Sequence, residues 1–261
     1  TIRDSSVKVD AHEIVELVDA GTVGDKSHIP LTLEEPWNIL LAGSVLKIDF
    51  NRVILQVIKV EGRKVTGRIL EGGIIKSNKG VGHDLDIHLP AFTSKDLHAF
   101  KIAKRVGINT VALSFASSAR DVADLREYFE GNVVVISKIE SAIGLSNVDD
   151  ICKESDAILI DRGDLSREVP IEKIPFAQQY IQKKAKEMKT PVYVATNLLE
   201  SMVRNYKPTR AEINDIAYTL FSGADGLVLA AETTIGNYPV ESVRMIVRMI
   251  NEVSNRVHSG D

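Results

Sequence analysis

The pattern of apolar and polar positions divides the chain into two regions that differ in rhythm. Up to about residue 76 the apolar runs are short and strand-like, as in SVKVD, HEIVELV, SVLKIDF, RVILQVIKV and RKVTGRIL. Gly62 follows Glu61 between the last two runs and suits a tight turn. The polar stretch 19–36, which contains glycine and proline, suits a loop. We therefore expect a small β-rich module over residues 1–76.

The remaining region, residues 77–261, alternates amphipathic helices with short apolar strands, most clearly after Pro90. The candidate strands are residues 110–115, 132–137, 157–160, 191–195 and 226–230. Glycines 107, 131 and 223 follow predicted helices, where a left-handed cap is expected. Because strands that are apolar on both faces must be covered on both sides, this region is predicted to be a barrel or a doubly wound parallel sheet.

Composition and charge narrow the classes of function. Apolar residues make up 44% and charged residues 26% of the chain, which is the balance of an ordinary globular protein. The net charge of -4 gives no basic field to attract nucleic acid. Cys152, the single cysteine, cannot form an intrachain disulfide and is expected to be buried. Without an apolar window of about 18 residues or a secretory signal, we expect a cytoplasmic protein with no membrane partner.

Polar residues follow each predicted strand at its C-terminal end, the pole at which barrel enzymes place their active sites. They are Ser114, then Lys138 and Glu140, then Asp161, Arg162, Gly163 and Asp164, then Thr196 and Asn197, and finally Glu232 and Thr233. If the second strand continues through Lys138 and Glu140, the two side chains share one face and can meet the same ligand.

Two of these carboxylates, Glu140 and Asp164, are candidates for a Mg2+ site, since one or two protein carboxylates commonly hold this ion. Lys138 would add a positive charge where negative charge develops. Gly163 allows close approach of a ligand, and its amide and that of Asp164 could donate to an anion. The spacing alone leaves another interpretation open, in which Lys138 and Glu140 form a surface ion pair and the RGD sequence is a plain loop.

Six ordered sequence motifs resemble those of the pyruvate kinase family. They are IIKSNKGV, VALSFASSARDV, ISKIES, RGDL followed by EVP, ATNLLESM followed by PTRAE, and AETTIGNYPVE. The resemblance covers about residues 69–250 well, and the preceding β-rich part more loosely. It implies an α/β fold of the TIM (β/α)8 type, incomplete in this chain, in which residues 77–261 form a barrel segment that carries the active site and residues 1–76 form a reduced lid domain.

The same resemblance implies a phosphotransferase that moves the phosphoryl group of phosphoenolpyruvate to ADP, giving pyruvate and ATP through a metal-stabilised enolate. Lys138 would face the transferring group and the enolate oxygen. Glu140 and Asp164 would ligate Mg2+ or Mn2+. The amides of Gly163 and Asp164 and the hydroxyl of Thr196 would receive the substrate carboxylate, and Thr196 would lie near the carbon that is protonated.

Further positions match the family pattern with other implied roles. Lys79 matches a lysine beside the nucleotide phosphates, and Ser114 matches a substrate-binding position near the metal sites. The family also implies K+, although its acidic and hydroxyl ligands would lie upstream of Thr1 with the first barrel strands. We therefore expect a homo-oligomer or a barrel completed by further chain.

Three departures from the family pattern bear on nucleotide handling and turnover. Asp161 replaces a usually small residue, Ser166 replaces a usual glycine, and Ile235 stands where a lysine is usual. Two other functions therefore stay open, a metal-dependent lyase or aldolase of 2-oxo acids and a catalytically degenerate barrel that serves as a binding module. Asp84, Asp86 and His88 would share a strand face, but a transition-metal site there is not favoured.

Overall fold

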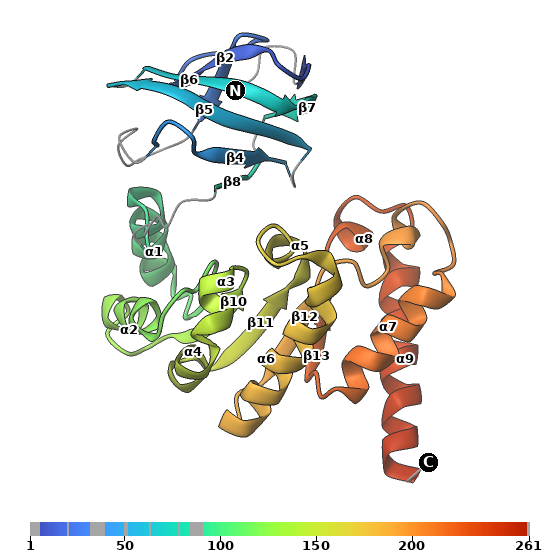
Figure 1. The fold of residues 1–261 in the computed structure, drawn as a ribbon. Coiled ribbons are helices and arrows are strands. Elements are labelled where there is room, and N and C mark those ends of the chain that lie inside the picture. The colour runs from blue at the N-terminus through green and yellow to red at the C-terminus, as the bar shows by residue number, and fades with distance from the viewer. Residues whose placement is uncertain are drawn as a thin grey trace. The chain divides into compact units, whose positions relative to one another are not determined.

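The computed structural model forms two compact units, Thr1–Leu89 and Pro90–Asp261 (Figure 1). The residues that it describes are 6–19, 21–31, 40–49, 52–62, 64–77, 79–83 and 91–259. The first unit extends past residue 76 because strand β8 (Val81–His83) pairs antiparallel with β4 (Val45–Ile48). The assignment of 1–76 as a lid domain and 77–261 as a barrel domain stays a prediction.

The small unit is built from β-strands. Its described strands are β1 (Ser6–Val9), β2 (Ile14–Asp19), β3 (His28–Leu31), β4, β5 (Val53–Glu61), β6 (Lys64–Glu71), β7 (Gly73–Lys76) and β8. Six of them form a mixed sheet in the order β3-β2-β6-β5-β4-β8, while β1 pairs with β7. Gly62, at φ 62°, occupies the turn between β5 and β6 as expected.

One expectation for the small unit is wrong in part. The stretch 19–36 was expected to be a loop, but β3 lies within it and pairs parallel with β2. Ile29 and Leu31 alternate with His28 and Pro30, and their side chains are buried in the core of this unit. This two-residue period is strand-like, although it is short and sits among turn-forming residues.

The large unit contains an open sheet of five parallel strands. In the order of the sheet these are β13 (Gly226–Val228), β12 (Val192–Ala195), β11 (Ala157–Asp161), β10 (Val134–Ile139) and β9 (Thr110–Leu113). All five lie within or next to the ranges predicted from the sequence. Because the strands are parallel and adjacent in chain order, their C-terminal ends meet at one edge of the sheet.

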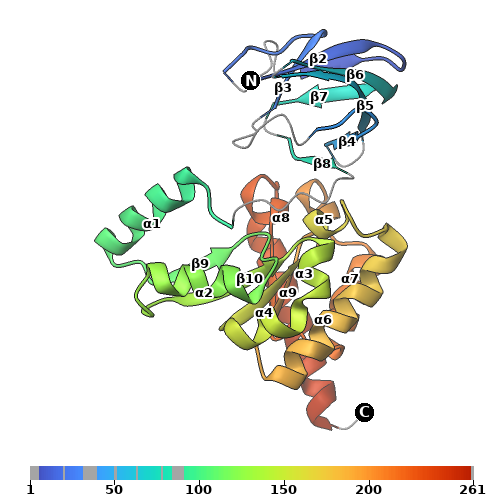
Figure 2. The ribbon, with the colours of Figure 1, turned by 60° about the vertical axis from the view of Figure 1, so that its left-hand side comes forward.

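Helices alternate with these strands along the chain and cover the sheet (Figure 2). The α-helices are α1 (Ser94–Val106), α2 (Ala119–Tyr128), α3 (Ala142–Ser146), α4 (Val148–Glu154), α5 (Arg162–Leu165), α6 (Ile174–Met188), α7 (Arg210–Phe221), α8 (Ala231–Thr234) and α9 (Pro239–Ser259), and the 3-10 helices are η2 (Ile171–Lys173) and η3 (Glu200–Val203). None of the described helices combines the length and the apolar character needed to cross a bilayer.

Capping residues explain where three of the longer helices begin. Thr93, Ser118 and Thr209 each accept a hydrogen bond from the backbone amide three residues later. The acidic side chain at that third position accepts one in return from the amide of the capping residue. Each such cap stabilises its helix by about 1 kcal/mol. The predicted left-handed caps are also present, with Gly107, Gly131 and Gly223 at φ 76°, 78° and 98°.

The apolar core of the large unit explains the direction of the polar side chain near the end of β10. Val135 and Ile139 of β10 are fully buried and belong to the same apolar cluster as residues of α2, α4 and α6. Burying a side chain of this size stabilises the fold by about 2 kcal/mol. Because side chains alternate along a strand, Lys138 points to the opposite face from Ile139. The packing of the helix-covered face therefore fixes the direction of Lys138, while Glu140 follows directly after the last residue of β10.

Candidate active site

The C-terminal end of β10 brings together a buried ion pair. The Nζ atom of Lys138 lies 2.6 Å from Oε1 of Glu140 and 3.4 Å from Oδ2 of Asp161. The Glu140 side chain is only 1% exposed, and that of Lys138 is 21% exposed. A pair on the open surface would leave both groups in water, whereas here the Glu140 carboxylate is buried and the Lys138 ammonium is mostly covered.

The two carboxylate oxygens of Glu140 have different partners. Its Oε2 accepts a hydrogen bond of 2.7 Å from the amide of Phe115, in the turn after β9. Its buried Oε1 has no hydrogen-bond partner among the described residues, and its contact with Lys138 is an ion pair. A buried carboxylate oxygen that lacks a hydrogen-bond donor is costly unless a cation compensates it.

Burial and charge shift the ionisation of this pair. Burial raises the pKa of Glu140, an effect that the Lys138 ammonium and the Phe115 amide offset only in part. Burial alone would lower the pKa of Lys138, but the close ion pair with Glu140 and the charge of Asp161 outweigh it and raise the pKa. Lys138 is therefore a cation at neutral pH.

Three carboxylates converge beside the ammonium group. Oxygens of Glu140, Asp161 and Asp164 all lie within 4.8 Å of one another. Hard oxygen ligands at this spacing fit a divalent cation such as Mg2+ or Mn2+. Asp164 is also paired, since its Oδ1 lies 2.6 Å from Nη2 of Arg167. The sequence argument named Glu140 and Asp164 for this cluster but missed Asp161.

Thr196, which directly follows β12, contacts both Gly163 and Asp161 of this cluster. Its Oγ1 accepts a hydrogen bond of 2.9 Å from the amide of Gly163 and lies 3.0 Å from Oδ1 of Asp161. A Cβ atom at Gly163 would lie 3.4 Å from Cγ2 of Thr196, which is ordinary van der Waals contact, so this approach does not by itself require glycine. Thr196 and Asn197 have φ values of 69° and 55°, a left-handed conformation that is strained for a β-branched residue and is often found at functional sites.

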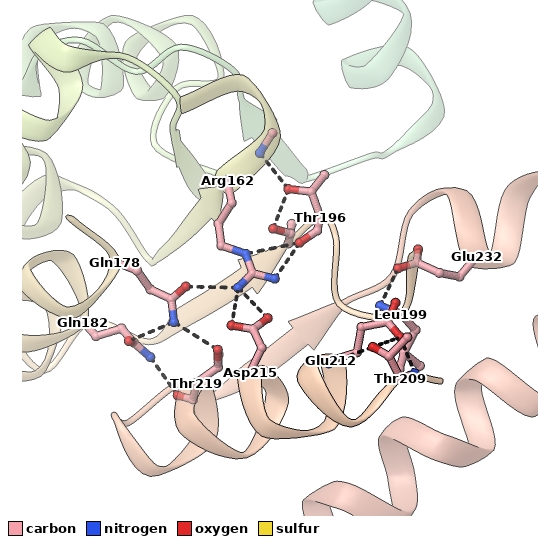
Figure 3. A network of polar contacts seen from close by, with 12 residues as sticks. Arg162, Gln178, Gln182, Thr196, Leu199, Thr209, Glu212, Asp215, Thr219 and Glu232 are labelled. Carbon is pink, nitrogen blue, oxygen red and sulfur yellow. Dashed lines mark hydrogen bonds and ion pairs between the residues drawn. The ribbon is translucent and has the colours of Figure 1, made fainter. Parts of the chain in front are cut away.

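Arg162 holds the backbone of Thr196 in this conformation (Figure 3). Its Nε and Nη2 atoms donate to the Thr196 carbonyl oxygen at 3.2 and 2.7 Å. Its Nη1 donates to both carboxylate oxygens of Asp215, in α7, at 2.9 and 2.8 Å. The Arg162 side chain is only 10% exposed, so Asp215 provides the main charge compensation for a buried guanidinium group.

Replacement of Asp215 by alanine is expected to lower the free energy of unfolding by about 2 kcal/mol, because it leaves the buried guanidinium of Arg162 without its carboxylate partner. Chemical denaturation followed by circular dichroism measures this loss. Asn214→Ala, an exposed position in the same helix, is the matched control and should change stability by less than about 0.5 kcal/mol. Equal effects of the two substitutions would contradict the assigned role of Asp215.

The other predicted site residues are Ser114 in the large unit and Lys79 in the small unit. Ser114 is exposed in the turn after β9, next to Phe115. Lys79 belongs to the small unit, where its Nζ lies 3.4 Å from Oδ1 of the buried Asp49. Residues 84–88, with the alternative metal ligands, lie outside the described residues.

Comparison with known sequences identifies the family of this site. The sequence model described as "Pyruvate kinase, barrel domain" matches residues 3–243. The chain belongs to the pyruvate kinase family. The predicted fold class is thereby confirmed, since the five parallel strands are part of the pyruvate kinase barrel domain and not a doubly wound sheet.

Curated pyruvate kinases from several bacteria resemble the chain over most of its length. The enzyme of Mycobacterium tuberculosis is 35% identical over 242 residues, which cover 91% of this chain and 51% of that protein. The enzyme of Clostridium acetobutylicum is 34% identical over 241 residues, or 90% of this chain and 51% of that protein. The chain thus spans about half the length of the pyruvate kinases that it matches.

Proposed function

We propose that the chain is a pyruvate kinase-like phosphotransferase that moves the phosphoryl group of phosphoenolpyruvate to ADP. The main observation in support is the cluster of Lys138, Glu140 and Asp164 at the C-terminal ends of β10 and β11, in a chain of this family. A buried ammonium beside converging carboxylates suits phosphoryl transfer, which depends on positioning and charge neutralisation more than on covalent catalysis.

Each site residue has a separate part in this proposal. Glu140 and Asp164 would hold Mg2+ or Mn2+, which supplies neutralisation of the negative charge that develops on the 2-oxygen. The Lys138 ammonium faces the transferring phosphoryl group and stabilises the enolate oxygen by its charge. In this proposal the hydroxyl of Thr196 lies near the carbon that is protonated, and with the amides of Gly163 and Asp164 it receives the substrate carboxylate.

The remaining assignments complete the same proposal. Lys79 binds the nucleotide phosphates, and Ser114 contributes to the substrate site from the turn after β9. K+ serves as a second cation, and the working enzyme is a cytoplasmic homo-oligomer or a barrel completed by further chain. Its partners are small molecules, namely phosphoenolpyruvate or pyruvate and ADP or ATP.

The direct test is an assay of the chain in its working form, as the homo-oligomer or the completed barrel, with phosphoenolpyruvate, ADP, Mg2+ and K+. We expect ATP and pyruvate to form together in equal amounts, and a chelator of divalent cations to stop the reaction. Absence of ATP under these conditions would contradict the proposal for this chain. Consumption of pyruvate that requires an aldehyde and no nucleotide would instead support a lyase or aldolase.

A further inference from the structure

Asp161 occupies an unusual place among the groups of the site. Its side chain is only 14% exposed, at the C-terminal end of β11. Oδ1 lies 3.0 Å from Oγ1 of Thr196, and Oδ2 lies 3.4 Å from Nζ of Lys138. Both carboxylate oxygens therefore face hydrogen-bond donors that the proposed substrate would also need.

A backbone donor is directed to the same carboxylate. The amide of Asp164 donates to Oδ1 of Asp161 over a long distance of 3.5 Å. The neighbouring amide of Gly163 is bound to the Thr196 hydroxyl instead. An ammonium, a hydroxyl and an amide are the groups that recognise a carboxylate or phosphate ligand, and all three already contact Asp161.

An arriving anion meets two obstacles at this position. It must take the Thr196 hydroxyl and the Asp164 amide from Asp161, whose own carboxylate then loses hydrogen bonds in a mostly buried place. It is also repelled by the charge of Asp161, which offsets part of the attraction of Lys138. Such repulsion is stronger in a partly buried site than in water.

We propose that Asp161 is a specificity-determining residue that acts as an internal competitor of the anionic substrate. The site then binds small carboxylate or phosphate anions more weakly than it would with a neutral residue at position 161. The identity of the substrate as phosphoenolpyruvate rests on the proposed function, whereas the competition itself rests on the contacts of Asp161. Asp161 orients donors and sets affinity without taking part in the chemical step.

The test compares two substitutions by direct binding. Asp161→Asn removes the charge and keeps an oxygen that can accept from Thr196 and Asp164, while Asp161→Ala removes both. Oxalate, a small dianion, is titrated calorimetrically into each protein at a saturating Mn2+ concentration without nucleotide, after a separate Mn2+ titration has established saturation. We expect Asp161→Asn to bind oxalate about tenfold more tightly than the unsubstituted chain, and Asp161→Ala at least as tightly.

A matched control removes a carboxylate elsewhere in the same unit. Asp150 is exposed and its Oδ1 pairs with Lys153 at 2.8 Å, so Asp150→Asn should leave oxalate affinity unchanged. Equal or weaker oxalate binding by both Asp161 variants, including no measurable binding by any protein, would overturn the inference. If Asp161→Ala does not fold, the nearly isosteric Asp161→Asn decides the question.

Kinetic measurements separate this inference from the proposed function. If the chain transfers phosphate to ADP, Asp161→Asn should lower the KM for phosphoenolpyruvate, whereas a merely structural defect would lower kcat and leave KM unchanged or higher. Tighter oxalate binding without any phosphoryl transfer would uphold the role of Asp161 and count against the phosphotransferase. Phosphoryl transfer with unchanged oxalate affinity would support the phosphotransferase and count against the role of Asp161.

Discussion

Replacement of Lys138 by methionine is expected to slow phosphoryl transfer from phosphoenolpyruvate to ADP by about 100- to 1000-fold, equivalent to about 3 to 4 kcal/mol of transition-state stabilisation. Methionine keeps the length and the apolar stem of the side chain but removes the ammonium 2.6 Å from Glu140. The rate of ATP formation at saturating substrate measures the effect. Turnover equal to that of the unsubstituted chain would refute the assignment of Lys138.

Lys138→Met should also change the thermal stability of the chain, because it alters the charge around Glu140. Without the ammonium, the buried Glu140 carboxylate loses its cationic partner, so the metal-free variant should unfold at a lower temperature. Mn2+ should restore that stability by more than it stabilises the unsubstituted chain, because it then supplies the missing positive charge. Lys153→Met, which removes an exposed ammonium paired with Asp150, is the control and should alter neither quantity.

The sequence predicted well those features that depend on local periodicity. The two-residue alternation of β10 directs Lys138 away from the buried Ile139, and Glu140, the residue after this strand, brings its Oε1 to 2.6 Å from the Lys138 ammonium. The five strands of the large unit were predictable because each is a short apolar run between amphipathic helices. The place of the site at their C-terminal ends follows from the parallel arrangement of these strands.

Other features depend on contacts between distant segments and could not be predicted from periodicity. The bond between Arg162 and Asp215 joins residues 53 apart, and no local pattern marks it. The left-handed conformation of Thr196 is unfavourable for that residue type and arises because Arg162 holds its carbonyl. Asp161 was noticed only as a departure from the family pattern, while its contacts with Lys138 and Thr196 required the fold.

Replacement of Glu140 by glutamine is expected to weaken Mn2+ binding by at least about 100-fold, since the loss of partners outside the first coordination shell alone costs 10- to 100-fold in other metal sites. Glutamine keeps an oxygen that can accept from the Phe115 amide but removes one of the three converging charges. Electron paramagnetic resonance of free Mn2+ gives the affinity directly. A change smaller than about threefold would rule out Glu140 as a ligand.

The stability of the Glu140→Gln variant distinguishes metal binding by Glu140 from a purely structural role. Burial raises the pKa of Glu140, which means that the fold disfavours the charged form relative to the unfolded chain. A neutral glutamine escapes that penalty but leaves the Lys138 ammonium with Asp161 as its remaining carboxylate partner, so the two effects oppose each other and the unfolding temperature of the metal-free variant should fall less than that of Lys138→Met. The exposed Glu172→Gln is the control and should change neither metal affinity nor stability. Loss of metal binding in a variant that loses little stability would therefore indicate that the buried carboxylate is kept for the cation and not for the fold.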